Sequence, residues 1–418
     1  MITRNRHMID SRATHRQGHR LSKRSLRLTA EGWYYVLVIA FIIGGAVLRE
    51  VNLLVLLAGL MMGPMTWNWL IAKRALRNLA ATRLGTNRTH AGKPLSIKWQ
   101  IYNHDRRIPS WGIALEESLS RKSESRGVWM RAVAPCVAPQ QATQAGYELR
   151  FRERGEYFFG PARFSTSFPL GLVRSRSSIS DKFRVLVWPQ IGQMTSAWKR
   201  LLQRSHAGYE TSRPRRGQLE GDYYGLREWR AGDSRRWIHW RTSARVNNLI
   251  VKQFEQRRDE SLSLVIDLWT PSENPQAVQA DVERLLRFAA TVIEDRRRLA
   301  RHEVQISIQG AQHNTWRGLM KDRLAAQIQD EFAVAQAAAW DETRPIETLW
   351  QDLDGRSRVI IVLSTRLQPA GAASSLQYGD LLWISPSEFS EWFEDVPSEQ
   401  TNTVLTSTPN ANVKEVAT

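Results

Sequence analysis

The chain has 418 residues, of which 42% are apolar and 24% are charged, a composition typical of a globular protein with two to three domains. It excludes a wholly disordered chain, and the single cysteine, Cys136, excludes a small scaffold held by disulfides. Nearly all of the net charge of +18 comes from three short basic regions, residues 1–30, 73–77 and 199–258.

Two uncharged runs, residues 33–48 and 51–72, predict a transmembrane helical hairpin behind a basic tail over 1–30. At 1.5 Å per residue the second run spans ~30 Å of hydrocarbon, and the aromatic residues at 33–35 suit the membrane interface. A signal peptide and a buried core helix are the alternatives for the two runs. Lys and Arg crowd both outer flanks, so the positive-inside bias predicts that both termini and the soluble domains are cytoplasmic.

Residues 80–190 are predicted to form a small β-sandwich. Apolar and polar residues alternate over 95–101 and again over 147–151, and a period of two is typical of strands with one buried face. Gly and Pro separate these short runs, and no long helical pattern interrupts them. The pattern favours a structural or adhesive role for this region.

The region 259–396 is predicted to be a three-layer α/β domain, because runs typical of strands alternate with runs typical of helices. A parallel sheet covered on both faces follows from this order. Asp267 ends the first strand, which is where ligands bind in such sheets. The polar tail over 397–418 is predicted to be disordered. The predicted strands span 261–269, 302–309, 358–364 and 381–385, and the predicted helices span 276–300 and 319–339.

The segment 199–258 connects these regions, and within it arginines, tryptophans and acids are interleaved over 221–255. A turn before Asp233 predicts that this residue is the N-cap of a short helix through Trp237 and Trp240, with Arg236 as a further partner for its carboxylate. Asn247 and the asparagine after it predict a second turn.

Four interpretations of the stretch 221–255 are open. The favoured one is a network of arginine, acid and indole groups that joins the two modules. The others are a docking surface for a partner protein, a nucleic-acid surface, and catalysis by His239. His239 has no obvious acid or nucleophile as a partner in the sequence, and a histidine between two tryptophans is usually a packed one.

The same stretch resembles the signature of the bacterial "domain of unknown function 58" (DUF58) family, through GLREW at 225–229, AGD at 231–233, IHW at 238–240, SAR at 243–245 and VKQFE at 251–255. Similar motifs precede it, including RGEY at 154–157 and FPLGL at 168–172. The motif positions identified as partner-binding candidates are Gly225, Arg227, Trp229, Gly232, Asp233, Arg236, His239, Trp240, Ser243, Ala244, Arg245 and Lys252.

The resemblance implies a von Willebrand factor A-like domain after the signature, and partnership with MoxR-type AAA+ ATPases and membrane transglutaminase-like proteins. The metal site of such a domain needs Asp-x-Ser-x-Ser, since hydroxyls and a carboxylate supply oxygen ligands to Mg²⁺. Here Trp269 and Pro271 occupy the hydroxyl positions after Asp267, so the site is degenerate and no metal is expected. The FPLGL motif also lacks the Asp that the family usually carries before its proline.

These observations predict an α+β multidomain protein: a scaffold or adaptor of the bacterial cytoplasmic membrane that is not an enzyme and needs no cofactor. The short signatures of phosphate, zinc and nucleophile chemistry are absent from the sequence. Two alternatives are kept. One is an enzyme of unknown reaction around His239, Asp233 and Asp267, and the other is a nucleic-acid binder that uses residues 199–258.

Overall fold

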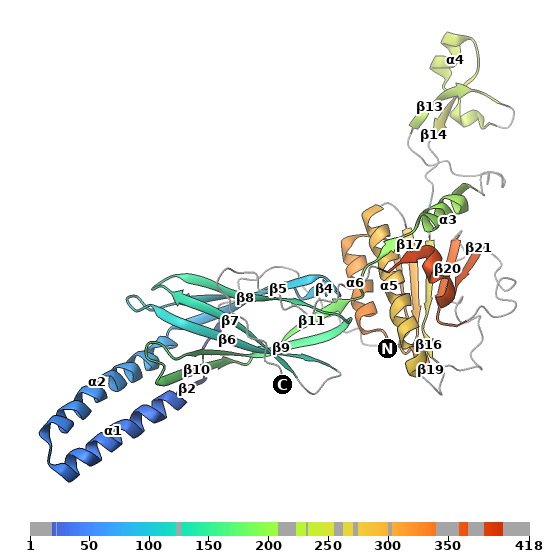
Figure 1. Ribbon diagram of the computed structural model, residues 1–418. Coiled ribbons are helices and arrows are strands. Elements are labelled where there is room, and N and C mark those ends of the chain that lie inside the picture. Colours follow the sequence, from blue (N-terminus) through green and yellow to red (C-terminus); the bar gives the residue numbers. More distant parts are fainter. Residues whose placement is uncertain are drawn as a thin grey trace, which may run out of the picture. The chain divides into compact units, whose positions relative to one another are not determined.

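The computed structural model is a mixed α/β protein whose residues form two compact units that divide at Gln190. Figure 1 shows its helices and strands. Three regions with predictions lie outside the described residues: the tail over 397–418, most of the basic tail over 1–30, and Gly232. The predicted disorder of 397–418 therefore stays a prediction. The structure describes residues 19–21, 23–122, 127–207, 223–230, 233–254, 262–270, 275–299, 303–339, 359–366 and 380–395.

Two antiparallel helices, α1 (Ala30–Arg49) and α2 (Asn52–Ala75), begin unit 1 and are drawn in blue in Figure 1. Both are long and apolar enough to cross a membrane. Thr29 caps α1, because its side chain accepts a hydrogen bond from Gly32 N–H at 3.0 Å. Each helix begins within three residues of its predicted start and ends within three residues of its predicted end.

The described strands of unit 1 form two sheets, and β5 carries the alternation predicted at 95–101. The four-stranded sheet has the order β1-β3-β5-β8. The seven-stranded sheet has the order β2-β10-β9-β11-β4, with β6 paired to β9 and β7 to β6. The strands are β1 (His19–Arg20), β2 (Lys23–Leu28), β3 (Leu79–Leu84), β4 (Arg88–His90), β5 (Pro94–Asn103), β6 (Ser110–Arg121), β7 (Val128–Val137), β8 (Ala142–Arg150), β9 (Gly155–Thr166), β10 (Val173–Ile179) and β11 (Phe183–Trp188).

One hydrophobic core lies between these sheets, with Ile97 and Trp99 from one and Phe159 and Phe164 from the other. All four side chains are fully buried or nearly so. Inside this core lies a buried ion pair between Arg83 of β3 and Glu117 of β6. We call residues 79–188 the two-sheet module.

Unit 2 contains a five-stranded sheet of order β18-β17-β15-β20-β21. The four strands from β17 to β21 are parallel, as predicted, whereas β18 pairs antiparallel with β17. The elements of this unit outside the family signature are β12 (Gln193–Met194), α3 (Ser196–Ala207), β15 (Leu262–Asp267), β16 (Trp269–Thr270), α5 (Pro275–Leu299), β17 (Glu303–Gln309), β18 (Asn314–Leu319), α6 (Asp322–Val334), β19 (Ala338–Ala339), β20 (Val359–Ser364), β21 (Asp380–Ile384), η3 (Pro386–Glu388), α7 (Phe389–Trp392) and β22 (Phe393–Glu394).

The helices α3, α5, α6 and α7 all pack into one hydrophobic cluster, on the face of the sheet that carries Leu264 and Ile266. The opposite face has a smaller buried cluster that includes Val265 and Trp383. Among the described residues no helix contributes to this second cluster, so the predicted helical cover of both faces is seen on one face.

The helix predicted over 319–339 is shorter than expected. It begins at Asp322 and ends at Val334. Leu319 is the last residue of the edge strand β18, whose residues are alternately half-buried and exposed. After α6 the chain leaves the helical path because Ala338 N–H donates to Leu268 O at 3.0 Å and β19 pairs with β16. This tertiary pairing overrides the helix propensity of the alanine-rich sequence.

Candidate functional site

The family signature folds as a small module of β13 (Tyr223–Glu228), η1 (Arg235–Trp237), α4 (Trp240–Val246) and β14 (Ile250–Phe254), described here by itself (Figure 1). The strands β13 and β14 pair antiparallel, with Leu226 opposite Lys252 and Arg227 opposite Val251. Trp229 extends the pairing, because its backbone N–H donates to Leu249 O at 2.8 Å. The signature residues of both strands therefore share one ribbon, which includes Gly225.

Asp233 closes the turn after β13 through a bidentate ion pair. Arg227 donates from both terminal nitrogens to the two carboxylate oxygens, each at 2.7 Å, and Arg230 N–H donates to Oδ2 at 2.9 Å. The indole N–H of Trp229 donates to the Asp233 carbonyl at 3.3 Å. The prediction that Asp233 is the N-cap of a short helix is wrong, because Ser234 is the N-cap of η1 and His239 that of α4. The Asp233 carboxylate binds Arg227 and the backbone of Arg230 in place of the predicted Arg236.

His239 caps α4. Its Nδ1 accepts from Thr242 N–H at 3.3 Å and lies 2.8 Å from Thr242 Oγ1. The buried hydroxyl of Ser243 accepts from Ile250 N–H at 2.9 Å and lies within donating distance of His239 O at 3.1 Å. The Ser243 side chain thus joins α4 to β14, whereas the His239 side chain bonds within α4. This agrees with the interpretation of His239 as a packed residue.

One face of α4 is exposed and carries the remaining signature residues. Trp240 is 66% exposed, and Arg241, Ala244 and Arg245 are exposed beside it at helical spacing. Arg236 is exposed on η1. Outside this module a guanidinium lies over an indole ring in the two-sheet module, where Arg163 is 4.3 Å from the Trp129 ring. We call Arg236, Trp240, Arg241, Ala244 and Arg245 the signature face.

The ion pair gives the turn after β13 a pH dependence that can be measured. The hydrogen bonds from Arg227, then that from Arg230 N–H, lower the pKa of Asp233 from 3.8 to about 2. Because the folded pKa is the lower one, the stabilisation is complete above about pH 4 and is lost as the pH falls through about 2. We expect the Arg230 amide to lose protection from hydrogen exchange in this window. Equal protection in Asp233→Asn and wild type at pH 5 would contradict this.

The second candidate site is Asp267, at the carboxyl end of β15. Its Oδ2 accepts from Ser364 Oγ at 2.8 Å and from Arg366 Nε at 2.7 Å, and the side chain is fully buried. The Arg366 guanidinium also lies over the Trp269 ring at 5.5 Å. Burial raises the pKa of Asp267, although Arg366 and Ser364 act in the opposite direction.

The residues around Asp267 do not fit a magnesium ion. A guanidinium, which is a permanent cation, already bonds to the carboxylate, and Trp269 stands where the metal motif needs a hydroxyl. Among the described residues no group of three His, Cys, Asp or Glu is arranged to hold a metal. Ser364 and Arg366 were not predicted as part of this site. They could have been identified because they follow the predicted strand over 358–364. In a parallel sheet the end of this strand, β20, lies beside the end of β15.

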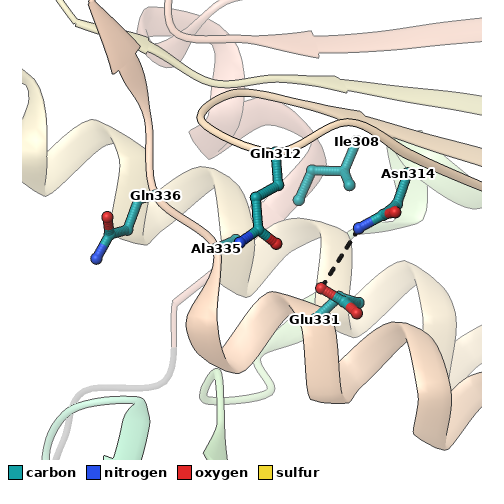
Figure 2. Close-up of a pocket in the computed structure, with 6 residues that line it drawn as sticks. All are labelled: Ile308, Gln312, Asn314, Glu331, Ala335 and Gln336. Atoms are coloured by element: carbon teal, nitrogen blue, oxygen red, sulfur yellow. Dashed lines mark hydrogen bonds between the residues drawn. The ribbon is translucent and has the colours of Figure 1, made fainter. Parts of the chain in front are cut away.

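A small pocket lies between β17, β18 and α6 (Figure 2). It has room for about one water molecule. The Asn314 amide donates to Glu331 Oε2 at 3.5 Å, and the Gln312 side chain ends near Ala335. This pocket is too small for an organic substrate.

Comparison with known proteins points to the same family as the motif. Residues 225–299 match the family described as "Protein of unknown function DUF58". The "Uncharacterized protein YeaD" of Bacillus subtilis (strain 168) is 26% identical over 201 residues, which are 47% of this chain and 50% of that protein. The chain thus matches about half the length of this relative. Together the two similarities support the DUF58 family for this protein.

Solved structures resemble parts of the chain only distantly. The CARDB domain of PF1109 from Pyrococcus furiosus has 10% identity and a TM-score of 0.19, over 26% of this chain and 94% of that domain. A β-glucosidase from Listeria innocua has 12% identity and a TM-score of 0.18, over 26% of this chain and 16% of that enzyme. Neither similarity defines the fold or the chemistry of this protein.

Proposed function

We propose that this protein is a non-enzymatic adaptor of the bacterial cytoplasmic membrane, which binds a partner protein through the signature face. The proposal depends on the observation that some signature side chains build the module whereas others are exposed on its surface. Asp233, His239 and Ser243 are used in local hydrogen bonds, whereas Trp240 and the arginines beside it are exposed. Tryptophan and arginine are the side chains that most often dominate protein interfaces.

Membrane anchoring by α1 and α2 is part of this proposal. Both helices are long and apolar, Lys73 and Arg74 lie in the last turn of the second, and Arg77 follows it. With the basic residues before α1, these charges favour a multi-pass topology in which the termini and both units are cytoplasmic. The parallel strands of unit 2 support a von Willebrand A-like layout that lacks the metal.

The chemistry of the signature face favours a partner with an acidic surface and an apolar pocket for the Trp240 indole. The family resemblance adds a MoxR-type AAA+ ATPase or a transglutaminase-like membrane protein as the first partners to test. An enzyme built on His239 and Asp233 is less well supported, because both side chains already hold the module together.

A photo-crosslinker placed at Trp240 in the full chain tests the proposal in native membranes. We expect it to capture one partner reproducibly, and we expect Trp240→Ala to weaken binding of that purified partner about tenfold or more. Leu319, which is 48% exposed on β18, is the matched control position and should capture nothing.

Two results would contradict the adaptor. One is an unchanged affinity in Trp240→Ala together with Arg245→Ala. The other is capture of nucleic acid instead of protein, with an affinity that falls steeply as the salt concentration rises. The second result would support the nucleic-acid alternative.

A further inference from the structure

Unit 1 exposes apolar side chains at the end of the two-sheet module that lies beside α1 and α2. Trp111, Phe168 and Leu170 are 44%, 41% and 51% exposed. The rings of Trp111 and Phe168 stack with centroids 5.8 Å apart and planes 24° apart. Thr166 fixes this arrangement, since its hydroxyl donates to Trp111 O at 2.8 Å and accepts from Phe168 N–H at 3.2 Å. We call Trp111, Phe168 and Leu170 the apolar patch.

The loop that carries Phe168 and Leu170 is attached to the base of the hairpin. Thr29 N–H, just before α1, donates to Leu172 O at 3.1 Å. The approach is close: a side chain on Gly32 of α1 would meet Leu172 O at 2.1 Å. On the other side, Ser110 Oγ donates to Ala75 O at the end of α2 at 2.8 Å. Both segments that bear the patch, the loop between β9 and β10 and the start of β6, are thus fixed to the helices.

The same contacts define how far the loop reaches along the helices. Leu172 and Val173 pack with Ala72, and with side chains that include Tyr35 of α1 and Met65 of α2. Trp33 lies two residues before Tyr35 and Trp67 two residues after Met65, and both tryptophans are exposed. Tryptophan is enriched where the hydrocarbon meets the lipid headgroups. The loop therefore lies at the depth of the membrane interface if the helices span the bilayer.

We propose that the apolar patch inserts into the interfacial layer of the bilayer and holds the two-sheet module against the membrane. This inference rests on the membrane anchoring proposed above. Two observations favour lipid as the occupant. The residues that bear the patch are bonded to the ends of two helices whose apolar side chains are exposed. Exposed basic residues, Lys73 and Arg74 in the last turn of α2 and Arg77 after it, lie within two positions of Ala75, which contacts the residue before Trp111. Such residues attract anionic headgroups.

Depth-dependent fluorescence quenching tests the patch in the full chain. The native thiol is removed by Cys136→Ser, and an environment-sensitive dye is attached through one new cysteine at a time. The chain is reconstituted in vesicles of phosphatidylcholine and phosphatidylglycerol that carry a spin label either near the headgroups or deep in the acyl chains. Leu170→Cys reports on the patch, and Leu56→Cys, 68% exposed on α2, reports on the hairpin.

Val128→Cys is the matched control, because Val128 is apolar and 61% exposed but lies at the opposite end of β6 and β7. At ~3.3 Å per residue along β6 it is roughly 25 Å from Trp111. We expect the dye at Leu170 to shift to the blue and to lose most of its emission to the shallow label. The dye at Leu56 should lose its emission to the deep label, and the dye at Val128 should be unaffected by either.

Two outcomes would overturn the inference, and they are distinguishable. Quenching at Leu56 without quenching at Leu170 leaves the hairpin in the bilayer and removes the patch from it. Absence of quenching at Leu56 removes the hairpin from the bilayer and the patch with it. An unlabelled Leu170→Ser chain with the unfolding temperature of the wild type would confirm that substitution at this position leaves the fold intact.

Discussion

Glu117→Ala is expected to destabilise the two-sheet module by about 3–5 kcal/mol, the range for breaking a buried ion pair from one side. Glu117 is fully buried in the core between the sheets and pairs with Arg83, whose side chain is 4% exposed. Trp99 and Tyr147 also donate to its carboxylate, at 3.2 and 2.6 Å. Burial raises the pKa of Glu117 in spite of the arginine beside it. Removing the carboxylate leaves a guanidinium in an apolar core.

The double variant Arg83→Met with Glu117→Gln separates the charge from the shape of the site. It should recover much of the lost stability, because no buried charge remains and the glutamine oxygen still accepts from Tyr147. Glu153→Ala is the control, since this residue pairs with Arg121 at an exposed position and should change stability by at most about 1 kcal/mol. Denaturant unfolding of the full chain in detergent measures all three. Equal effects of Glu117→Ala and Glu153→Ala would contradict the argument.

Local periodicity was enough to predict the long helices and several of the strands. The uncharged runs gave the two long helices, and the alternation over 95–101 gave β5, because a long apolar run and a period of two each favour one structure. The edge strand β18 was missed. Its residues alternate between half-buried and exposed positions, and no continuous apolar run marks it.

Partners that are distant in the sequence could not be predicted in this way. Arg83 and Glu117 are 34 positions apart on strands of different sheets, and each resembles an ordinary exposed charge in its local sequence. The partner of Asp233 was misassigned for a related reason. Arg236 is close along the chain, but the antiparallel ribbon that brings Arg227 to the carboxylate depends on pairing with β14.

The exposed residues of the signature illustrate a different limit. A motif can identify Trp240 and His239 equally well, but it does not distinguish a side chain that builds the module from one that faces outwards. The structure separates them: His239 caps α4, whereas Trp240 is 66% exposed on the same helix. The proposed partner-binding surface is therefore the signature face alone, and it excludes the motif residues that build the module.

Arg366→Ala is expected to destabilise unit 2 by about 3–5 kcal/mol, because it leaves the carboxylate of Asp267 buried without a cation. The pKa of Asp267, already raised by burial, should rise further in this variant, so its deficit in stability should shrink as the pH falls. Ser364→Ala is the matched control. It removes one neutral donor from the same oxygen and should lower the stability by about 1 kcal/mol.

The same pair predicts the response to magnesium. Since the guanidinium of Arg366 lies at 2.7 Å from Asp267 Oδ2, a divalent cation placed there would be repelled by it. We therefore expect the unfolding temperature of the wild-type chain to be the same with millimolar Mg²⁺ and with a chelator. A rise with Mg²⁺ in the wild type that disappears in Asp267→Asn would show that the carboxylate binds the ion in spite of the arginine. Such a result would contradict the prediction that no metal binds at Asp267.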